Sequence, residues 1–181
     1  MPRTALIVID MLNTYDHEDA DRLVESVRDV LPQIVSLKDK AKAREDVKLI
    51  YVNDNHDEWE AGRETLMERA LQGKHPELVE PIAPEGDRPF LPKGRHSAFY
   101  ETAVSHLLRV EDVKRVVLVG QVTEQCVFYS ALDAYLRGYE VVIPTDAVAH
   151  IVPEFARAAL GMAEKNAHAE LVKAGELELS G

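Results

Sequence analysis

The sequence of 181 residues has a single cysteine, Cys126. One cysteine excludes an intramolecular disulfide bond and any metal site built from several thiolates. A chain without disulfides is typical of a reducing compartment, so we expect this protein in the cytoplasm. A lone thiol is either a packing residue of the core or a candidate nucleophile, and composition does not separate the two.

Positive charge and long apolar runs are also scarce. The chain has 21 lysine and arginine residues against 32 aspartate and glutamate residues, a formal net charge of -11. Nucleic acids and anionic membranes attract positively charged surfaces, so we expect neither as a partner. The run Ala5–Ile9 ends at Asp10 and is too short for a signal peptide, and no later run approaches the length of a membrane span.

The sequence does contain enough apolar residues for a core. Its hydrophobic fraction of 46% is normal for a globular protein, and its length predicts one domain over residues 1–181. Several short apolar runs are nearly continuous rather than alternating, which is typical of strands buried on both faces of a parallel sheet. These predicted strands are Ala5–Ile9, Val47–Val52, Arg115–Val119 and Glu140–Ile143, with a short strand before Lys93 and an edge strand at Glu170–Val172.

Helical patterns lie between the predicted strands. An apolar stripe from Leu23 to Ala41 predicts a long amphipathic helix, which Pro32 should kink or restart. The other predicted helices are Glu60–Leu71, Ala103–Leu108, Gln125–Leu136 and Pro153–Lys165, and the proline-rich segment Gly73–Pro92 is predicted to be a long loop. This alternation predicts an α/β fold of three layers, α-β-α, with helices on both faces of an open, mostly parallel, Rossmann-like sheet of five to six strands.

Three reactive side chains lie near the ends of predicted strands. Asp10 ends the first strand, Lys93 follows the short strand, and Cys126 comes soon after the strand that leads to Gly120. Ligands of open α/β sheets bind beyond the carboxyl ends of the strands, so these three side chains are expected to meet at one edge.

Such a meeting would supply the parts of an acyl-transfer site. If Thr123 is a helix N-cap, Cys126 lies in the first helical turn, where backbone amides, the helix dipole and Lys93 would lower the pKa of its thiol. Asp10 would take the thiol proton and later return it. Each residue also has a structural interpretation, since Asp10 could cap a turn, Lys93 could be a surface residue, and Cys126 could pack in the core. Sequence patterning alone leaves this choice open.

Three ordered motifs connect these residues to a known family. They are the strand and aspartate of Ala5–Asn13, the lysine and Ser-Ala-Phe element of Lys93–Phe99, and the cysteine motif Val119–Val127, which continues through Ala131–Ala134 and Arg137–Tyr139. In these motifs the chain resembles the isochorismatase-like cysteine hydrolases, which include nicotinamidases, N-carbamoylsarcosine amidase and ureidoacrylate hydrolase. The resemblance extends roughly from Thr4 to Ala149.

The resemblance implies a role for each residue of the set. Asp10 would be the proton shuttle, Lys93 its electrostatic partner and Cys126 the nucleophile. A cis peptide bond would join Gln121 and Val122, and the amides of Val122 and Cys126 would face an oxyanion. The implied reaction is hydrolysis of a C–N bond in a small non-peptide amide, ureide or lactam through a thioester, without a cofactor, by a homo-oligomer.

The chain also departs from the family pattern near the expected substrate. The family often has glutamine at the position of Leu12 and phenylalanine at that of Tyr15, so contacts near Asp10 are expected to differ. The side chains that we expect to contact substrate are Tyr15, Asn53, Asn55, His96 and Gln125. The aromatic residues Trp59, Phe99, Tyr100 and Tyr129 are expected either to line a pocket or to pack in the core.

A metal centre is not expected. Nicotinamidases bind a divalent metal through an Asp-x-His pair and a further histidine, and Asp54, His56 and His75 are the candidates for such a set here. The Asp-Trp-His-Pro context and the second nearby histidine are missing, so we predict that Asn53, Asp54 and His56 shape the rim of the site by hydrogen bonding.

Two other functions compete with the amidohydrolase. An isochorismatase-type hydrolase cleaves a vinyl ether with the aspartate and lysine and does not need the thiol, so the presence of Cys126 counts against it. A non-catalytic binding member of the same fold is the other alternative, since a fold does not fix a function.

Overall fold

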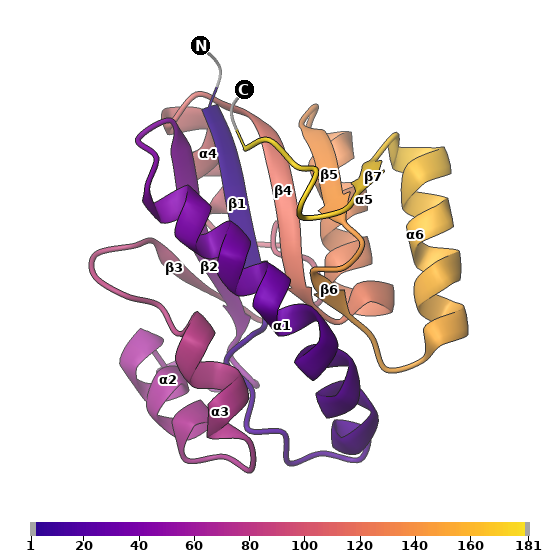
Figure 1. The fold of residues 1–181 in the computed structure, drawn as a ribbon. Coiled ribbons are helices and arrows are strands. Elements are labelled where there is room, and N and C mark those ends of the chain that lie inside the picture. The colour runs from indigo at the N-terminus through magenta and orange to yellow at the C-terminus, as the bar shows by residue number, and fades with distance from the viewer. Residues whose placement is uncertain (1–2, 180–181) are drawn as a thin grey trace.

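The computed structural model describes residues 3–179, which form one seven-stranded sheet between layers of helices (Figure 1). The strand order is β3-β2-β1-β4-β5-β7, with the short β6 beside β4, and every pair is parallel. The strands are β1 (Arg3–Ile9), β2 (Val47–Asp54), β3 (Phe90–Lys93), β4 (Val113–Gln121), β5 (Glu140–Pro144), β6 (Val148–Ala149) and β7 (Glu170–Val172). The predicted α/β class and the edge strand at Glu170–Val172 are confirmed. The predicted strand number was too low because β6 has only two residues and no apolar run of its own.

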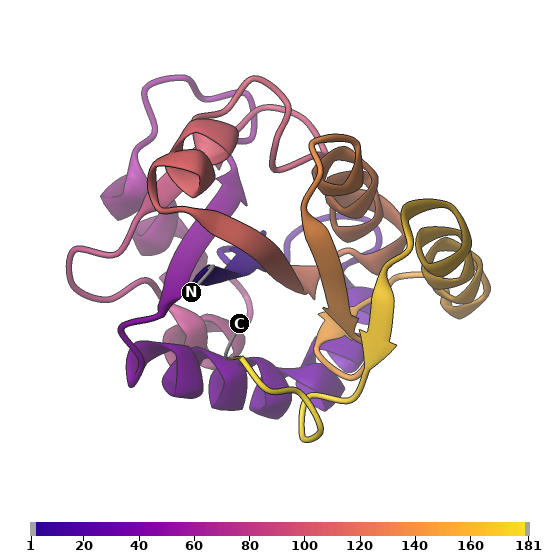
Figure 2. The same ribbon diagram turned by 90° about the horizontal axis from the view of Figure 1, so that it is seen from above.

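The helices divide between the two faces of the sheet. They are α1 (Ala20–Lys42), α2 (Arg63–Leu71), α3 (Pro76–Val79), α4 (Val104–Val110), α5 (Phe128–Leu136) and α6 (Pro153–Ala167), with short turns η1 (Glu80–Ile82) and η2 (Thr123–Val127). Seen from above, α1 runs along one face, and α4, α5 and α6 cover the other (Figure 2). None of the helices within residues 3–179 combines the length and apolar character needed to cross a bilayer.

The central strand β1 explains why its sequence is a continuous apolar run. Leu6 and Val8 belong to the core beneath α1, whereas Ala5, Ile7 and Ile9 belong to the core beneath α4 and α5. Successive side chains of a strand point to opposite faces, so a strand covered on both sides must be apolar at every position. This double burial fixes where β1 ends, and with it the position of the residue that follows.

Two local features differ from simple interpretations of proline. Of the two outcomes predicted at Pro32, the restart does not occur: α1 continues through it, and Leu31 and Ile34 on either side are both buried in the same core. The predicted loop Gly73–Pro92 contains α3 and η1, and it also includes most of β3. Tertiary burial of apolar residues thus outweighed the local preference of proline for turns.

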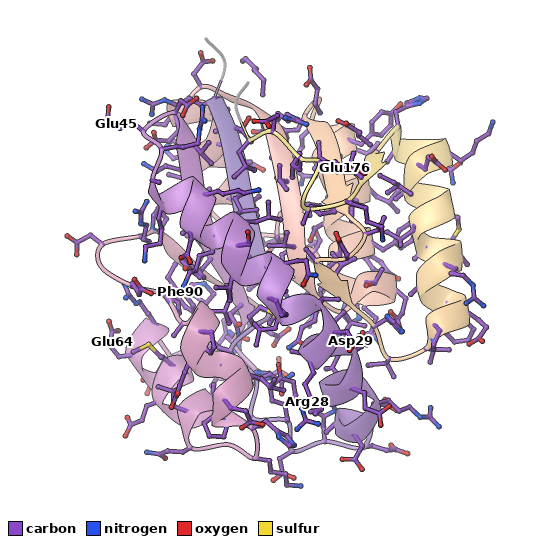
Figure 3. The ribbon with its side chains drawn as sticks, viewed as in Figure 1. Arg28, Asp29, Glu45, Glu64, Phe90 and Glu176 are labelled. Atoms are coloured by element: carbon purple, nitrogen blue, oxygen red, sulfur yellow. The ribbon has the colours of Figure 1, made fainter. Side chains whose placement is uncertain are left out.

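Charged side chains such as Arg28, Asp29 and Glu45 lie on the outside of the molecule (Figure 3). The backbones of β1 and β4 approach closely at their carboxyl ends, where Gly120 lies opposite Ile9. Gly120 has a φ of 117°, and a Cβ atom at this position would lie 2.1 Å from the carbonyl oxygen of Ile9. Only glycine fits here.

We expect Gly120→Ala to lower the free energy of unfolding by roughly 2–5 kcal/mol, from backbone strain and from overpacking of β1 against β4. Urea unfolding of the two proteins measures the difference. Gly138→Ala is the matched control, since Gly138 also has a positive φ, of 82°, but a Cβ there meets nothing within 4 Å. Equal losses in the two variants would show that the approach of β4 to β1 is unimportant.

Candidate active site

The three predicted reactive side chains meet at the carboxyl edge of the sheet. Asp10 directly follows β1, Lys93 is the last residue of β3, and Cys126 lies in η2, after β4. The Nζ atom of Lys93 lies 2.9 Å from Oδ2 of Asp10 and 3.5 Å from Sγ of Cys126. One ammonium group therefore contacts both the carboxylate and the sulfur. The predicted convergence of these residues, more than 100 positions apart at the extremes, is therefore confirmed.

The ammonium group of Lys93 is buried and fully paired. Its side chain is 0% exposed, whereas that of Asp10 is 14% exposed. A third acceptor, Oδ2 of Asp54, lies 3.3 Å from Nζ. An ammonium group has three hydrogens, so Asp10, Asp54 and Cys126 together satisfy it. The contact with Asp54 was not predicted, although the place of Asp54 at the end of β2, next to β3, was a signal for it.

Burial and the neighbouring charges set the protonation states of these groups. Burial acts to lower the pKa of Lys93, but the attraction of Asp10, Cys126 and Asp54 outweighs it and the pKa rises, so the ammonium stays charged. Burial raises the pKa of the Asp10 carboxyl, and Lys93 offsets this only in part. Burial and the negative charge of Asp10 raise the pKa of the Cys126 thiol, against the opposing effect of Lys93. The expected lowering of the thiol pKa was wrong, because burial and the charge of Asp10 outweigh the effect of Lys93.

The backbone around the cysteine also differs from the simple helix start that was predicted. Thr123 does not cap a helix, because its hydroxyl donates to the carbonyl of Ala149 at 2.8 Å. The segment forms a wide turn in which the amide of Val127 donates to the carbonyl of Val122 at 3.2 Å. Cys126 consequently lies in this turn, two residues before α5 begins at Phe128. The predicted cis peptide bond between Gln121 and Val122 is present.

A dense set of hydrogen bonds holds Asp10 in place. Its backbone has a φ of 55°, its Oδ1 accepts from the amide of Asp54 at 2.7 Å, and its own amide donates to Val52 at 2.9 Å. The side-chain amide of Gln121 donates to the carbonyl of Asp10 at 2.6 Å. Sequence reasoning did not identify Gln121, although a glutamine that ends an otherwise apolar strand was an available signal. These bonds aim the carboxylate at Lys93 and the thiol.

Two of the expected substrate contacts are internal cross-links instead. Asn53 is 2% exposed, and its side chain hydrogen-bonds both the backbone amide and the carbonyl of Leu12, at 2.9 and 3.1 Å. Tyr15 is fully buried, and its hydroxyl lies 3.5 Å from Oε1 of Gln121. Both residues therefore support the segment after β1 from within and do not line the cavity beside Lys93.

The other three expected contacts have different surroundings. His96 is exposed, and its Nδ1 atom lies 3.6 Å from Sγ of Cys126. Asn55 lines the cavity beside Lys93, and its backbone amide donates to the carbonyl of Lys93 at 2.9 Å. Gln125 is half-buried in the wide turn, where its amide donates to the carbonyl of Val122 at 3.0 Å.

A cavity of about 290 Å³ adjoins the buried lysine. Its walls combine apolar, polar and charged side chains from the segments after β2 and around β3: Asn55, Trp59, Ala61, Pro92, Lys93, Gly94, Arg95, Tyr100 and Glu101. The ring of Trp59 lies over Gly94, where a Cβ atom would be 2.9 Å from Cη2 of the indole. Of the four aromatic residues considered above, Trp59 and Tyr100 line this cavity and Phe99 is buried in the core.

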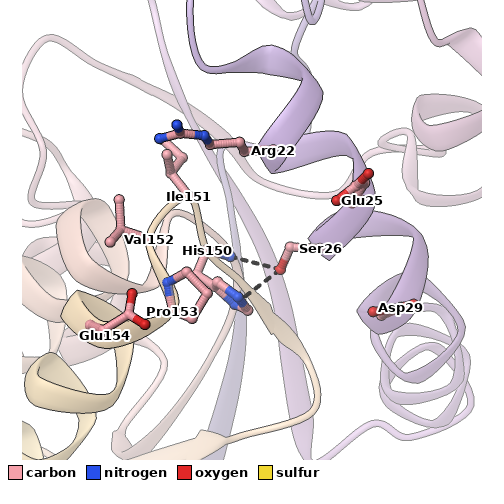
Figure 4. A pocket seen from close by; sticks show the side chains of 9 residues that line it. All are labelled: Arg22, Glu25, Ser26, Asp29, His150, Ile151, Val152, Pro153 and Glu154. Atoms are coloured by element: carbon pink, nitrogen blue, oxygen red, sulfur yellow. Dashed lines mark hydrogen bonds between the residues drawn. The ribbon is translucent and has the colours of Figure 1, made fainter.

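A separate surface hollow of about 420 Å³ lies between α1 and the segment that joins β6 to α6 (Figure 4). Ser26 of α1 accepts a hydrogen bond from the amide of His150 at 2.9 Å, and its Oγ lies 3.0 Å from Nδ1 of the same histidine. None of Asp10, Lys93 and Cys126 lines this hollow. Its Ser-His contact joins α1 to the edge of the sheet and provides no nucleophile activated by a carboxylate.

The side chains of the candidate metal ligands Asp54 and His75 have protein partners. Both oxygens of Asp54 are already engaged, with Lys93 Nζ and with the amide of His56 at 2.7 Å. The Nδ1 atom of His75 pairs with Glu77 at 3.0 Å. Within residues 3–179, no group of three or more His, Cys, Asp or Glu side chains is arranged to hold an ion. The residues present do not fit a metal centre.

Comparisons with known proteins agree with this geometry. The chain matches the model of the Isochorismatase domain over residues 4–174. It is 34% identical to the uncharacterized isochorismatase family protein YaaI of Bacillus subtilis over 92% of each chain. It is 28% identical to a probable inactive nicotinamidase of Arabidopsis thaliana, with 83% of each chain covered. It is 27% identical to the ureidoacrylate amidohydrolase RutB of Agrobacterium fabrum, with 84% of this chain and 78% of the relative covered.

The fold is also similar to that of a solved amidohydrolase. The nicotinamidase PncA of Bacillus subtilis superimposes with a TM-score of 0.75 at 28% identity, over 94% of this chain and 99% of the other. Sequence and structure therefore lead to the same conclusion: this chain belongs to the isochorismatase family.

Proposed function

We propose that this protein is a cysteine-dependent hydrolase of small non-peptide amides, ureides or lactams. The observation that carries the proposal is the contact of one buried ammonium with both a carboxylate and a thiol, at 2.9 and 3.5 Å. A lysine, an aspartate and a cysteine that only packed the core would not need to share these contacts. The named activities of two of the proteins compared, a ureidoacrylate amidohydrolase and a nicotinamidase, agree with cleavage of a C–N bond.

The first half of the reaction uses the buried side of the site. As Sγ of Cys126 attacks the carbonyl carbon, the thiol proton passes to the carboxylate of Asp10, which contacts the same ammonium of Lys93 as the sulfur does. Asp10 then gives that proton to the leaving nitrogen, and the C–N bond breaks to leave a thioester on Cys126. The positive charge of Lys93 stabilises the sulfur as it loses its proton. Transfer during the attack suits a thiol whose pKa is raised, because little free thiolate exists before substrate binds.

The negative oxygen of the tetrahedral intermediate needs hydrogen-bond donors. We propose that the backbone amides of Val122 and Cys126 donate to it, in agreement with the family resemblance. Substrate enters from the cavity beside Lys93, where Asn55 supplies a polar group and Trp59 an apolar wall. Nicotinamide and ureidoacrylate are the first amides to test, followed by small lactams and other ureides.

We expect Cys126→Ala to abolish turnover of whichever amide the wild type hydrolyses, with a loss of at least about 10⁴-fold, because no thioester forms without sulfur. Wild type and variant are assayed in parallel for release of amine or ammonia, and mass spectrometry of the quenched wild type locates the acyl group. Cys126→Ser is the matched variant of similar size. Full turnover in Cys126→Ala would contradict the mechanism, and activity on a vinyl ether that survives this change but not Asp10→Asn would favour the isochorismatase-type reaction.

We expect kcat/KM to fall as the pH drops through the pKa of Asp10. The carboxylate must be ionised to take the thiol proton, and burial raises its pKa, so the acid limb should lie above about 4, the ordinary value for aspartate. Initial rates measured between about pH 4 and pH 9 give the profile.

Asp54→Asn is the control for this profile, because it removes the other carboxylate on Lys93 and leaves Asp10 in place. The variant should keep an acid limb above the ordinary aspartate range. An acid limb that disappears in Asp54→Asn would assign the proton transfer to Asp54 instead of Asp10.

A further inference from the structure

The sulfur of Cys126 has a neighbour on its solvent side that the first half of the reaction does not use. Nδ1 of His96 lies 3.6 Å from Sγ, about the same distance as Nζ of Lys93 on the buried side. In the neutral tautomer that carries its hydrogen on Nε2, the lone pair of Nδ1 faces the sulfur and any acyl group bound to it. The residue is exposed, so water reaches this side of the site.

The two possible bases beside the sulfur differ in their access to water. The carboxylate of Asp10 is 14% exposed, and its oxygens are held by Lys93 and by the amide of Asp54. His96 is exposed, and its ring lies beside the sulfur and the ring of Tyr129. A water molecule that attacks a thioester on Cys126 from the solvent side therefore meets the imidazole before it meets the carboxylate.

We propose that His96 is a further catalytic residue, the base that activates water for hydrolysis of the thioester. The inference rests on the proposed function and divides its proton transfers between two groups. Asp10 serves the formation of the thioester on the buried side, and His96 serves its hydrolysis on the exposed side.

The step balances without any other reactant. Nδ1 of His96, the ring nitrogen that faces Sγ, takes one proton of the water while the water oxygen bonds to the carbonyl carbon. The C–S bond then breaks, and the same proton passes from Nδ1 to Sγ, which restores the thiol of Cys126 and a neutral imidazole. The acyl group leaves as a carboxylic acid.

Tyr129 holds the imidazole in this position. Its ring lies 5.4 Å from that of His96, centroid to centroid, with an angle of 36° between the planes. Tyr129 is in the first turn of α5, directly after the wide turn that contains Cys126. One short segment therefore carries both the sulfur and the surface on which the imidazole rests, which makes Tyr129 a positioning residue.

The test separates formation of the thioester from its hydrolysis with p-nitrophenyl acetate as the probe. The burst of nitrophenolate measures acetylation of Cys126, and mass spectrometry follows the decay of the acetyl thioester. In His96→Asn we expect the burst rate to stay within about twofold of wild type while the thioester decays roughly 100-fold more slowly, the usual effect of losing a general base. With an amide substrate, kcat would fall and kcat/KM would be nearly unchanged.

Three variants complete the design. His106→Asn removes another exposed histidine, on α4, and should leave both rates unchanged. Tyr129→Leu should slow only the decay, Tyr129→Phe should not, and Tyr129→Leu should add nothing in the His96→Asn background.

The possible outcomes are distinguishable. Unchanged decay in His96→Asn overturns the inference, and so does an equal slowing of burst and decay, which would place His96 in substrate binding. If wild type forms no thioester on Cys126, the proposed function itself fails, and the inference fails with it.

Discussion

The site depends on a single buried charge. The ammonium of Lys93 is removed from water, and a charge in that position is tolerated only when each of its hydrogens finds an acceptor. The acceptors come from three different segments: Asp10 after β1, Asp54 at the end of β2, and Cys126 in the turn after β4. The requirement to satisfy this one group therefore ties together the carboxyl ends of the central strands. It also places a carboxylate and a sulfur within reach of each other.

The sequence predicts those parts of the site that follow from where strands end. Asp10 follows β1, whose residues are buried on both faces, so the apolar run fixes where that strand stops and where this side chain emerges. Lys93 ends β3, in which Phe90 and Leu91 are half-buried and Pro92 is exposed. Their convergence follows from strand order. The wide turn around Cys126 could not be predicted in this way, because its form depends on Thr123 bonding to Ala149, a residue of a two-residue strand with no sequence signal of its own.

The predicted direction of the shift in the pKa of Cys126 was wrong. Lys93 near a thiol suggests a lowered pKa for Cys126, and that effect is present. Burial and the negative charge of Asp10 oppose it and are stronger, so the pKa of Cys126 rises. These opposing effects depend on depth and on distances of a few ångströms, which no residue pattern encodes.

A protonated thiol between a buried carboxylate and an exposed imidazole has a consequence for the whole cycle. In the proposed cycle, formation of the thioester uses a base on the buried side of the sulfur, and hydrolysis of the thioester uses a base that water can reach. The side chain of Asp10 is 14% exposed and contacts the same ammonium as the sulfur, whereas His96 is exposed and lies 3.6 Å from Sγ. On this proposal, the depth of each group below the surface, more than its intrinsic basicity, decides at which half of the reaction it acts.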